Sequence, residues 1–486
     1  MLPEQTPPHF IPIRRIKCSA LTLIFALGLS ACAQFPSVSD LARLKPVSDY
    51  ETNVSLAGTA SAWPAEGWWE SYGDPQLNAL IEEALRDSPD IAAASARLRQ
   101  AEAFGQVAGA PLWPQISANA SASDQRLSYN YLTPRSMTPE GWNDYGRATL
   151  DLNWEIDFWG KNRAGLAAAT SQLEASRAEH AQVRLALAVA VAGQYADLAQ
   201  LYAVRDTAAR SVEVRSKTAK LFNERFSNGL ETRGSLSEAQ ARLATAEGEL
   251  LTLEEQIGLL RNRLAALLGA GPDRGLTIER PAIRLADNFA LPSEVAANLL
   301  GRRPDIVAAR LITEAQLKRI DQKKAEFYPN VNLSAFIGAQ SLGLDMLTKG
   351  GSRVGGVGPV ISLPIFTGGR LRGELRGTVA SYDEAVANYN RTVSQALQDV
   401  ASAGLSQKAL AEQLVKARAA VAASGEAHRV ASDRYAGGLA NYLEVLYAED
   451  GLLASQRNLA NLQSRAFALD VAMKRALGGG YQANNI

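Results

Sequence analysis

One cysteine, Cys32, lies where its thiol could carry a covalently attached group. It ends the most apolar run of the chain (LTLIFALGLSAC), and the basic residues Arg14, Arg15 and Lys17 precede that run. The apolar stretch from Ala20 to Ser30 is about eleven residues long, whereas a helix that spans a bilayer needs about 20. A basic start, a short apolar core and small residues before the cysteine are typical of a signal peptide that is removed.

The segment Leu29-Ser30-Ala31-Cys32 resembles the lipobox of bacterial lipoproteins. In that motif diacylglycerol is attached to the cysteine thiol, the signal peptide is cut before the cysteine, and the new amino group is acylated. We therefore expect residues 1–31 to be a lipoprotein signal peptide. We also expect Cys32 to carry S-diacylglycerol and N-acyl lipid, with no other cofactor. The alternative is an ordinary hydrophobic helix that happens to contain a cysteine.

The rest of the composition argues against several functional classes. The chain has 50 basic and 50 acidic residues, and removal of the signal takes away three basic and one acidic, so no charge excess indicates a nucleic-acid partner. Cys18 leaves with the signal and Cys32 is acylated, which leaves no disulfide. His180 and His428 are the histidines that remain, too few and too far apart in sequence to suggest a metal site.

The chain reads as a tandem duplication. The segment SPDIAAASARL from Ser88 aligns with RPDIVAARLIT from Arg303, and the same offset brings Trp113 opposite Tyr328, each followed by proline. Further on, RFSNGLETRG aligns with RYAGGLANYL. Self-similarity at a long fixed period is typical of repeated structural units, here of roughly 210 residues. We therefore expect two copies of one plan.

Each copy contains a very long helix. The segment from Asn162 to Phe226 has no proline and only two glycines. At about 1.5 Å per residue this segment would extend about 100 Å as a helix. A helix of that length cannot fold back into a compact globule, so it must pack side by side with other helices.

Alternating segments between the helices predict strands. In YGRATLDLNWEIDF, which begins at Tyr145, apolar and polar residues alternate up to Phe158, and Trp154, Phe158 and Trp159 gather at one end, where an aromatic girdle would lie. A half-buried antiparallel sheet has the same period. The segment length and the charged polar face instead favour membrane strands beside a water-filled lumen. The candidate lumen residues are Arg147, Asp151, Asn153, Glu155, Asn332 and Ser334.

Four strands from one chain cannot close a barrel in a membrane. Transmembrane barrels need at least eight strands, and open strand edges in lipid leave unpaired backbone groups. If the chain spans a membrane, the barrel must therefore be shared between chains.

Several long motifs, in addition to the lipobox, resemble the TolC-like outer-membrane factors, specifically the NodT-like lipoprotein branch that serves resistance-nodulation-division efflux pumps. They are WWESYGDPQLNALIEEAL, the SPDI and RPDI signals, NWEIDFWGK, GPVISLPIFTGGRLRGEL, RYAGGLANYLEVLYAE and the ALGGG end. The resemblance covers essentially the whole mature chain. It implies a mainly α fold with a transmembrane β-barrel, in a homotrimer whose chains each give four strands to one twelve-stranded barrel. The helices would form an α-helical periplasmic barrel with a closable tip.

The resemblance also implies a domain plan. After the signal (1–31) we expect an N-terminal arm and equatorial part (32–75), a first repeat (76–270), an equatorial segment (271–300), a second repeat (301–477) and a C-terminal tail (478–486). The first repeat would hold a strand pair at about 114–158, a long helix at about 162–227 and a helix at about 236–268. The second would hold a strand pair at about 330–366, a long helix at about 370–436 and a helix at about 443–477.

The expected function is that of a passive conduit in the outer membrane, extending into the periplasm, and not that of an enzyme. The sequence has no G-x-x-x-x-G-K-[ST] phosphate loop that would supply energy. The resemblance implies an inner-membrane efflux pump and a periplasmic adaptor as partners, and drugs or other small toxic compounds as cargo. A type I secretion or heavy-metal efflux channel is the alternative within this class. A structural coiled-coil envelope lipoprotein and a lipid-anchored periplasmic hydrolase are alternatives outside it.

The resemblance places a gate at the Gly-Leu breaks of residues 225–238 and 434–447. Relatives hold this mouth shut with a tyrosine, an arginine and acids. Here Ala440 replaces the arginine of some relatives, and Ser235 and Tyr447 stand at acidic positions, so we expect an apolar constriction with an acidic ring at Glu444. Alternatively, Glu444 is a solvated helix residue. The gate candidates are Tyr435, Leu443, Glu444, Tyr447, Ser235 and Glu238.

Overall fold

The computed structural model describes residues 40–56, 62–130, 133–283, 292 and 295–483. Cys32 and the signal segment lie outside these residues, so the lipid attachment stays a prediction. The chain divides into two compact units. The first contains residues 105–169 and 315–383, and the second contains residues 43–104, 170–314 and 384–486.

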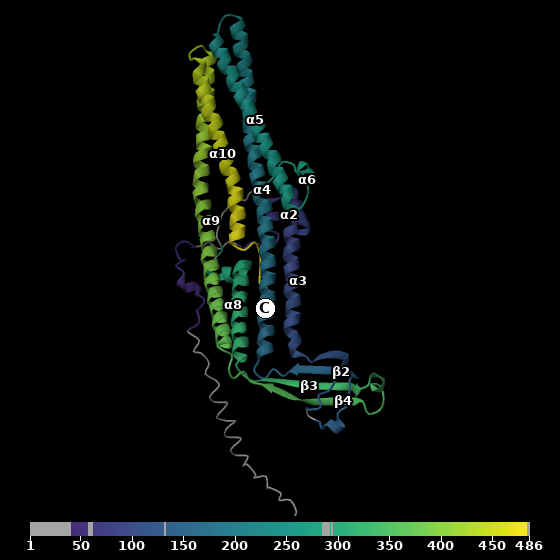
Figure 1. Cartoon of the computed structure of the whole chain (residues 1–486). Coiled ribbons are helices and arrows are strands. Elements are labelled where there is room, and N and C mark those ends of the chain that lie inside the picture. Colours follow the sequence, from purple (N-terminus) through teal and green to yellow (C-terminus); the bar gives the residue numbers. More distant parts are fainter. Residues whose placement is uncertain (1–39, 57–61, 131–132, 284–291, 293–294, 484–486) are drawn as a thin grey trace, which may run out of the picture. The chain divides into compact units, whose positions relative to one another are not determined.

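The first unit contains one antiparallel sheet with the strand order β1-β2-β3-β4. Its strands are β1 (Gln115–Gln125), β2 (Asn143–Glu155), β3 (Asn330–Leu342) and β4 (Arg353–Ser362). Figure 1 shows β2, β3 and β4 side by side. Strands β1 and β4 form the two outer edges, and within the described residues of the chain neither has a neighbour on its outer side.

Two strands end earlier than the sequence analysis predicted. Strand β2 stops at Glu155, and the carboxylate of Asp157 accepts the backbone N–H groups of Asn162 (3.2 Å) and Arg163 (2.9 Å). These bonds satisfy free donors at the start of the following helix, so Asp157 serves as a helix cap and not as a strand residue. Strand β4 stops before Pro364, where the nitrogen cannot donate to a ladder. The strand-pair ends at 158 and 366 are therefore corrected to 155 and 362.

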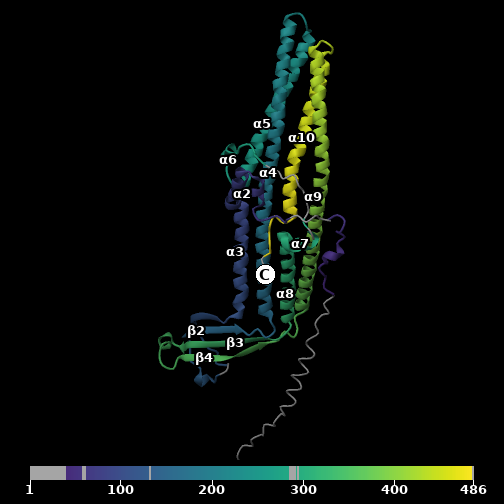
Figure 2. The same cartoon turned by 180° about the vertical axis from the view of Figure 1, so that it is seen from behind.

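The helices repeat with equal lengths in the two halves of the sequence. Helices α4 (Lys161–Ser227) and α9 (Arg370–Ala436) each have 67 residues, and α5 (Arg233–Leu267) and α10 (Tyr442–Ala476) each have 35. In the second unit α4 and α5 form one antiparallel hairpin and α9 and α10 form another, beside it (Figures 1 and 2). The remaining helices are α2 (Pro75–Asp87), α3 (Pro89–Gly109), α6 (Pro272–Leu276), α7 (Val295–Arg302) and α8 (Pro304–Ala325).

The turn of each hairpin follows from its residues. Gly229 and Gly438 adopt positive φ angles of 74° and 70°, which glycine reaches without a steric penalty. The side chain of Thr232 then accepts the N–H of Ser235 to cap α5, and the side chain of Asn441 caps α10 in the same way. The Gly-Leu breaks thus form tight turns between capped helices.

The core of the second unit packs α2 between the long helices. Buried side chains of α2 meet apolar residues of α4, α5 and α10, among them Leu77, Ile81, Val191, Leu264 and Phe467. Asp74 fixes the start of α2, because its carboxylate accepts from Gln76 N (2.9 Å), Tyr195 OH (2.7 Å) and Ala282 N (2.8 Å). None of the described helices combines the length and the apolar character needed to cross a bilayer.

Candidate functional site

The register of the sheet gathers the candidate lumen residues on one face. Residues directly opposite in neighbouring strands project to the same side. Asn153 lies between Gln115 and Ser334 in this register, and Glu155 lies opposite Asn332. The row therefore continues from strand to strand. The predicted members on this face are Arg147, Asp151, Asn153, Glu155, Asn332 and Ser334.

Hydrogen bonds fix the polar groups of this face. Asp151 accepts from the side-chain amide of Asn119 (2.9 Å) and from the hydroxyl of Thr149 (2.8 Å). Phe336, which interrupts the alternation of β3, lies opposite Asp151 in the register. The guanidinium of Arg147 lies over the Phe336 ring, 5.4 Å from its centroid, as a cation–π pair does. Arg147 thus lies over the ring of Phe336, the aromatic residue that interrupts the alternation.

The other face of the sheet is apolar and largely exposed among the described residues. Ile116, Ile337 and Val357 are 69%, 68% and 76% exposed. An apolar surface that extends over several strands is unfavourable in water and indicates contact with lipid or with another protein. The sheet therefore has one face suited to water and one suited to an apolar environment.

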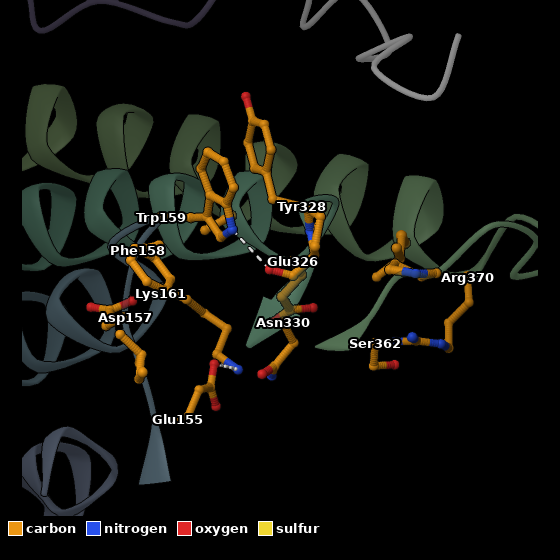
Figure 3. Close-up of a pocket in the computed structure, with 15 residues that line it drawn as sticks. Glu155, Asp157, Phe158, Trp159, Lys161, Glu326, Tyr328, Asn330, Ser362 and Arg370 are labelled. Atoms are coloured by element: carbon orange, nitrogen blue, oxygen red, sulfur yellow. Dashed lines mark hydrogen bonds and ion pairs between the residues drawn. The ribbon is translucent and has the colours of Figure 1, made fainter. Parts of the chain in front are cut away.

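A cavity of about 230 Å³ lies where the strands meet the following helices (Figure 3). Trp159 stacks on Tyr328 with ring centroids 4.6 Å apart, and its indole N–H donates to the carbonyl of Pro329 at 2.8 Å. Lys161 pairs with Glu155 at 2.5 Å, and Arg370, on another wall, pairs with Glu374 at 2.8 Å. The aromatic residue Trp159, predicted at the end of a strand, thus lies in this cavity beside charged side chains that already form ion pairs.

The gate candidates lie at the two hairpin turns of the second unit. Leu443 and Tyr447, one helical turn apart, are 46% and 73% exposed. Glu444 forms an ion pair with Arg434 at 3.2 Å, a partner that the sequence reasoning did not consider. That arginine precedes the turn in sequence and returns to Glu444 only because the hairpin closes.

The other gate candidates are held by neighbours on the same chain. Tyr435 accepts a hydrogen bond from Arg225 at 3.3 Å, and its ring meets the edge of Tyr442 with centroids 5.0 Å apart. The hydroxyls of Ser235 and Thr232 lie 2.9 Å apart. Glu238 pairs with Arg242 at 3.1 Å. The structure therefore brings candidates from both hairpins into one region.

A charged seam between α4, α5 and α10 was missed from the sequence. We use this name for Arg215, Arg242, Glu238, Glu449 and Asp450. Asp450 bridges the two arginines, at 2.8 Å from Arg215 and 3.1 Å from Arg242. Glu449 is only 4% exposed, and burial raises the pKa of its carboxyl.

The sequence did hold a signal for this seam. Glu449 occupies the apolar stripe of α10, three residues after the buried Leu446 and four before the buried Leu453. An acid in the middle of such a stripe is unusual, because apolar residues at this spacing form the buried face of a helix. Among the described residues no group of three or more His, Cys, Asp or Glu side chains could hold a metal ion.

Comparisons with known proteins agree with this architecture. The model of the outer membrane efflux protein family matches residues 80–270 and 295–479, which correspond to the two repeats. The multidrug resistance outer membrane protein MdtP of Escherichia coli is 33% identical over 434 residues, covering 88% of this chain and 89% of MdtP. The fusaric acid resistance protein FusA of Burkholderia cepacia is 38% identical over 336 residues, covering 67% of this chain and 63% of FusA.

A solved structure extends the likeness to the fold. The outer membrane protein VceC of Vibrio cholerae shares 48% of its residues with this chain, with a TM-score of 0.82. The alignment covers 86% of this chain and all of VceC. The predicted TolC-like fold class, with long helices and a strand domain, is thereby confirmed. The chain belongs to the outer membrane efflux protein family.

Proposed function

We propose that this chain is the passive outer-membrane conduit of a tripartite efflux system that exports drugs or other small toxic compounds. The names of its relatives support this cargo class, because MdtP is named a multidrug resistance protein and FusA a fusaric acid resistance protein. The conduit works without chemistry on its cargo and is not an enzyme. A separate inner-membrane pump supplies the energy, and a periplasmic adaptor joins the pump to the conduit.

The observation that carries this proposal is the two-faced sheet with open edges. One face is polar and hydrogen-bonded, and the other is apolar and exposed. The outer sides of β1 and β4 leave backbone groups that must be paired if the sheet lies in lipid. Three copies joined edge to edge supply twelve strands, enough to close a barrel around a wet lumen. A homotrimer, the assembly that the sequence resemblance implies, therefore pairs every strand edge.

The long helices suit the periplasmic part of such a conduit. A helix of 67 residues is about 100 Å long at about 1.5 Å per residue. Side-by-side hairpins from three chains then form an α-helical barrel through the periplasm. Lipid on Cys32 adds an anchor in the outer membrane, since one acyl chain binds only marginally and several together hold firmly.

Thiol labelling tests the two-faced sheet directly. The mature chain has no other free thiol if Cys32 is acylated, so Leu152→Cys and Asn153→Cys each introduce a single reactive site. In membranes, Asn153→Cys should react with a water-soluble maleimide, whereas Leu152→Cys should react only after denaturation. The two positions are adjacent in β2, so each is the matched control for the other. Equal labelling of both in intact membranes, or a monomer in mild detergent, refutes the barrel.

Growth assays test the cargo. Deletion of the gene from its natural host should lower the inhibitory concentration of several unrelated drugs, and the wild-type gene should restore it. Unchanged drug sensitivity together with new sensitivity to copper or silver salts would instead indicate heavy-metal efflux. Loss of a secreted protein from the medium, with drug sensitivity unchanged, would indicate type I secretion.

A further inference from the structure

Glu449 is a buried acid without a hydrogen-bond partner in the described structure. Both carboxylate oxygens are shielded from solvent, and neither accepts a hydrogen bond. The nearest cation is Arg215, whose Nε lies 3.8 Å from Oε1, but that arginine donates to Asp450 and to the carbonyl of Arg242. An ionised carboxylate in such a place loses its hydration without replacement. The ionised form of Glu449 is therefore disfavoured.

The charges around Glu449 balance only when it is neutral. Helix α4 contributes Arg215, and α5 contributes Arg242 and Glu238, which pair with each other. Helix α10 contributes Asp450, which bridges both arginines. Two cations thus face two anions before Glu449 is counted. A negative charge on Glu449 would leave one anion uncompensated inside the seam.

Within the described part of the chain, the other titratable groups near the seam supply no further cation to Glu449. Tyr442, at the start of α10, lies within electrostatic range, and burial raises the pKa of its hydroxyl. On α9, the hairpin partner of α10, His428 and Arg429 lie in the turns before the loop. Arg429 is occupied by Glu426 (2.5 Å) and Asp433 (3.0 Å) on its own helix.

We propose that Glu449 keeps its proton to higher pH than the exposed glutamates do and that its neutral carboxyl positions the first turns of α10 against α4 and α5. Loss of the proton places a charge in the seam and loosens this contact. Burial raises the pKa of Glu449, so the neutral form persists to higher pH than for an exposed glutamate. The stabilisation that the neutral carboxyl of Glu449 contributes is therefore present in mild acid and is lost as the pH rises through that raised pKa.

This proton bears on the gate, a consequence that rests on the proposed function. Leu443 and Tyr447 lie in the first two turns of α10, and Glu449 follows seven residues after the helix begins at Tyr442. Seven residues correspond to about 10 Å along the helix axis. A change in the packing of α10 at Glu449 is thus transmitted to the gate candidates by the helix itself. Protonation of Glu449 favours the closed mouth.

Thermal unfolding of the purified full-length protein tests the proton directly. Glu449→Gln keeps the shape of the neutral carboxyl but cannot ionise, and Glu247→Gln, an exposed glutamate of α5, is the control. At acidic pH the three proteins should unfold at similar temperatures. As the pH rises, Glu449→Gln should retain a higher unfolding temperature than wild type, whereas the control should follow wild type.

Infrared difference spectroscopy gives a second readout that needs no unfolding. In a titration from acidic to neutral pH, the absorbance of one protonated carboxyl should persist in wild type after the exposed carboxyls have ionised and should be absent from Glu449→Gln. If that band is missing and Glu449→Gln follows wild type at every pH, Glu449 is ionised and the inference is overturned. A lower unfolding temperature for Glu449→Gln at alkaline pH would also overturn it.

Single-channel recording in planar bilayers separates the inference from the proposed function. Raising the pH on the side of the hairpin turns should increase the open probability of wild type several-fold and leave Glu449→Gln closed. Channels that conduct but respond equally to pH in both proteins refute the role of Glu449 in the gate. If no variant conducts while the stability difference appears, the conduit proposal fails and the proton on Glu449 stands.

Discussion

Replacing Asp74 by alanine tests the contacts that hold α2 and the segment around Ala282 together. Asp74 is 3% exposed, and its carboxylate accepts three hydrogen bonds. Loss of the cap at the start of α2 destabilises by about 1 kcal/mol. The hydroxyl of Tyr195 and the N–H of Ala282 also lose their acceptor, at about 1–3 kcal/mol for each buried group. Because the Ala282 N–H is only part-buried, we expect about 4 kcal/mol in all.

Hydrogen–deuterium exchange measures this loss locally. The N–H of Ala282 donates to Asp74, and nearby Arg280 pairs with Asp206 at 2.7 Å in the intact fold. Release of the segment should speed amide exchange at Ala282 by at least about tenfold, since local opening becomes more populated. Asp90→Ala, an exposed acid in the first turn of α3, is the control and should change stability by at most about 1 kcal/mol. Exchange at Ala282 in Asp74→Ala at the wild-type rate would refute the reasoning.

Three further substitutions test other parts of the molecule. Gly478→Ala should lower the yield of folded protein, because a Cβ there would overlap the carbonyl of Arg302 and φ is +87°. Its control is Gly451→Ala, in an open helical position, which should leave the yield unchanged because it is neutral or stabilises the fold by up to about 1 kcal/mol. Cys32→Ser should abolish labelling by an alkynyl fatty acid that marks wild type, and a mature N-terminus upstream of residue 32 would contradict the lipobox. Leu443→Ala should raise single-channel conductance or open probability, and unchanged currents would place the constriction elsewhere.

The sequence predicted those parts of the fold that depend on local pattern. The lack of proline between Asn162 and Phe226 allowed one long helix, and the glycine at each break allowed a tight turn. The alternation around Asp151 predicted which residues of β2 share a face, because the side-chain period of a strand is two. Each of these features depends on the local sequence and not on contacts between distant segments.

Contacts between distant segments could not be predicted in this way. Glu444 was assigned without its partner, because Arg434 reaches it only across the closed turn. The end of β2 was placed too late, because Asp157 continues the alternation and yet serves as a helix cap. The partner of Asp450 is Arg215, on a different hairpin, more than 200 residues away. Such pairs depend on packing, which periodicity does not encode.

The duplication itself shows that the charged seam is not a requirement of the fold. Equivalent helices of the two repeats are offset by 209 residues, as the starts of α5 at Arg233 and α10 at Tyr442 show. At the equivalent positions, Arg215 corresponds to Ser424, Glu449 to Gln240 and Asp450 to Ala241. The equivalent positions on α9 and α5 thus lack these charges, although α9 has the same length as α4 and α5 the same length as α10. Because a buried acid is unfavourable unless it is paired or neutral, its presence in only one of the two copies favours a role in which the charge can change.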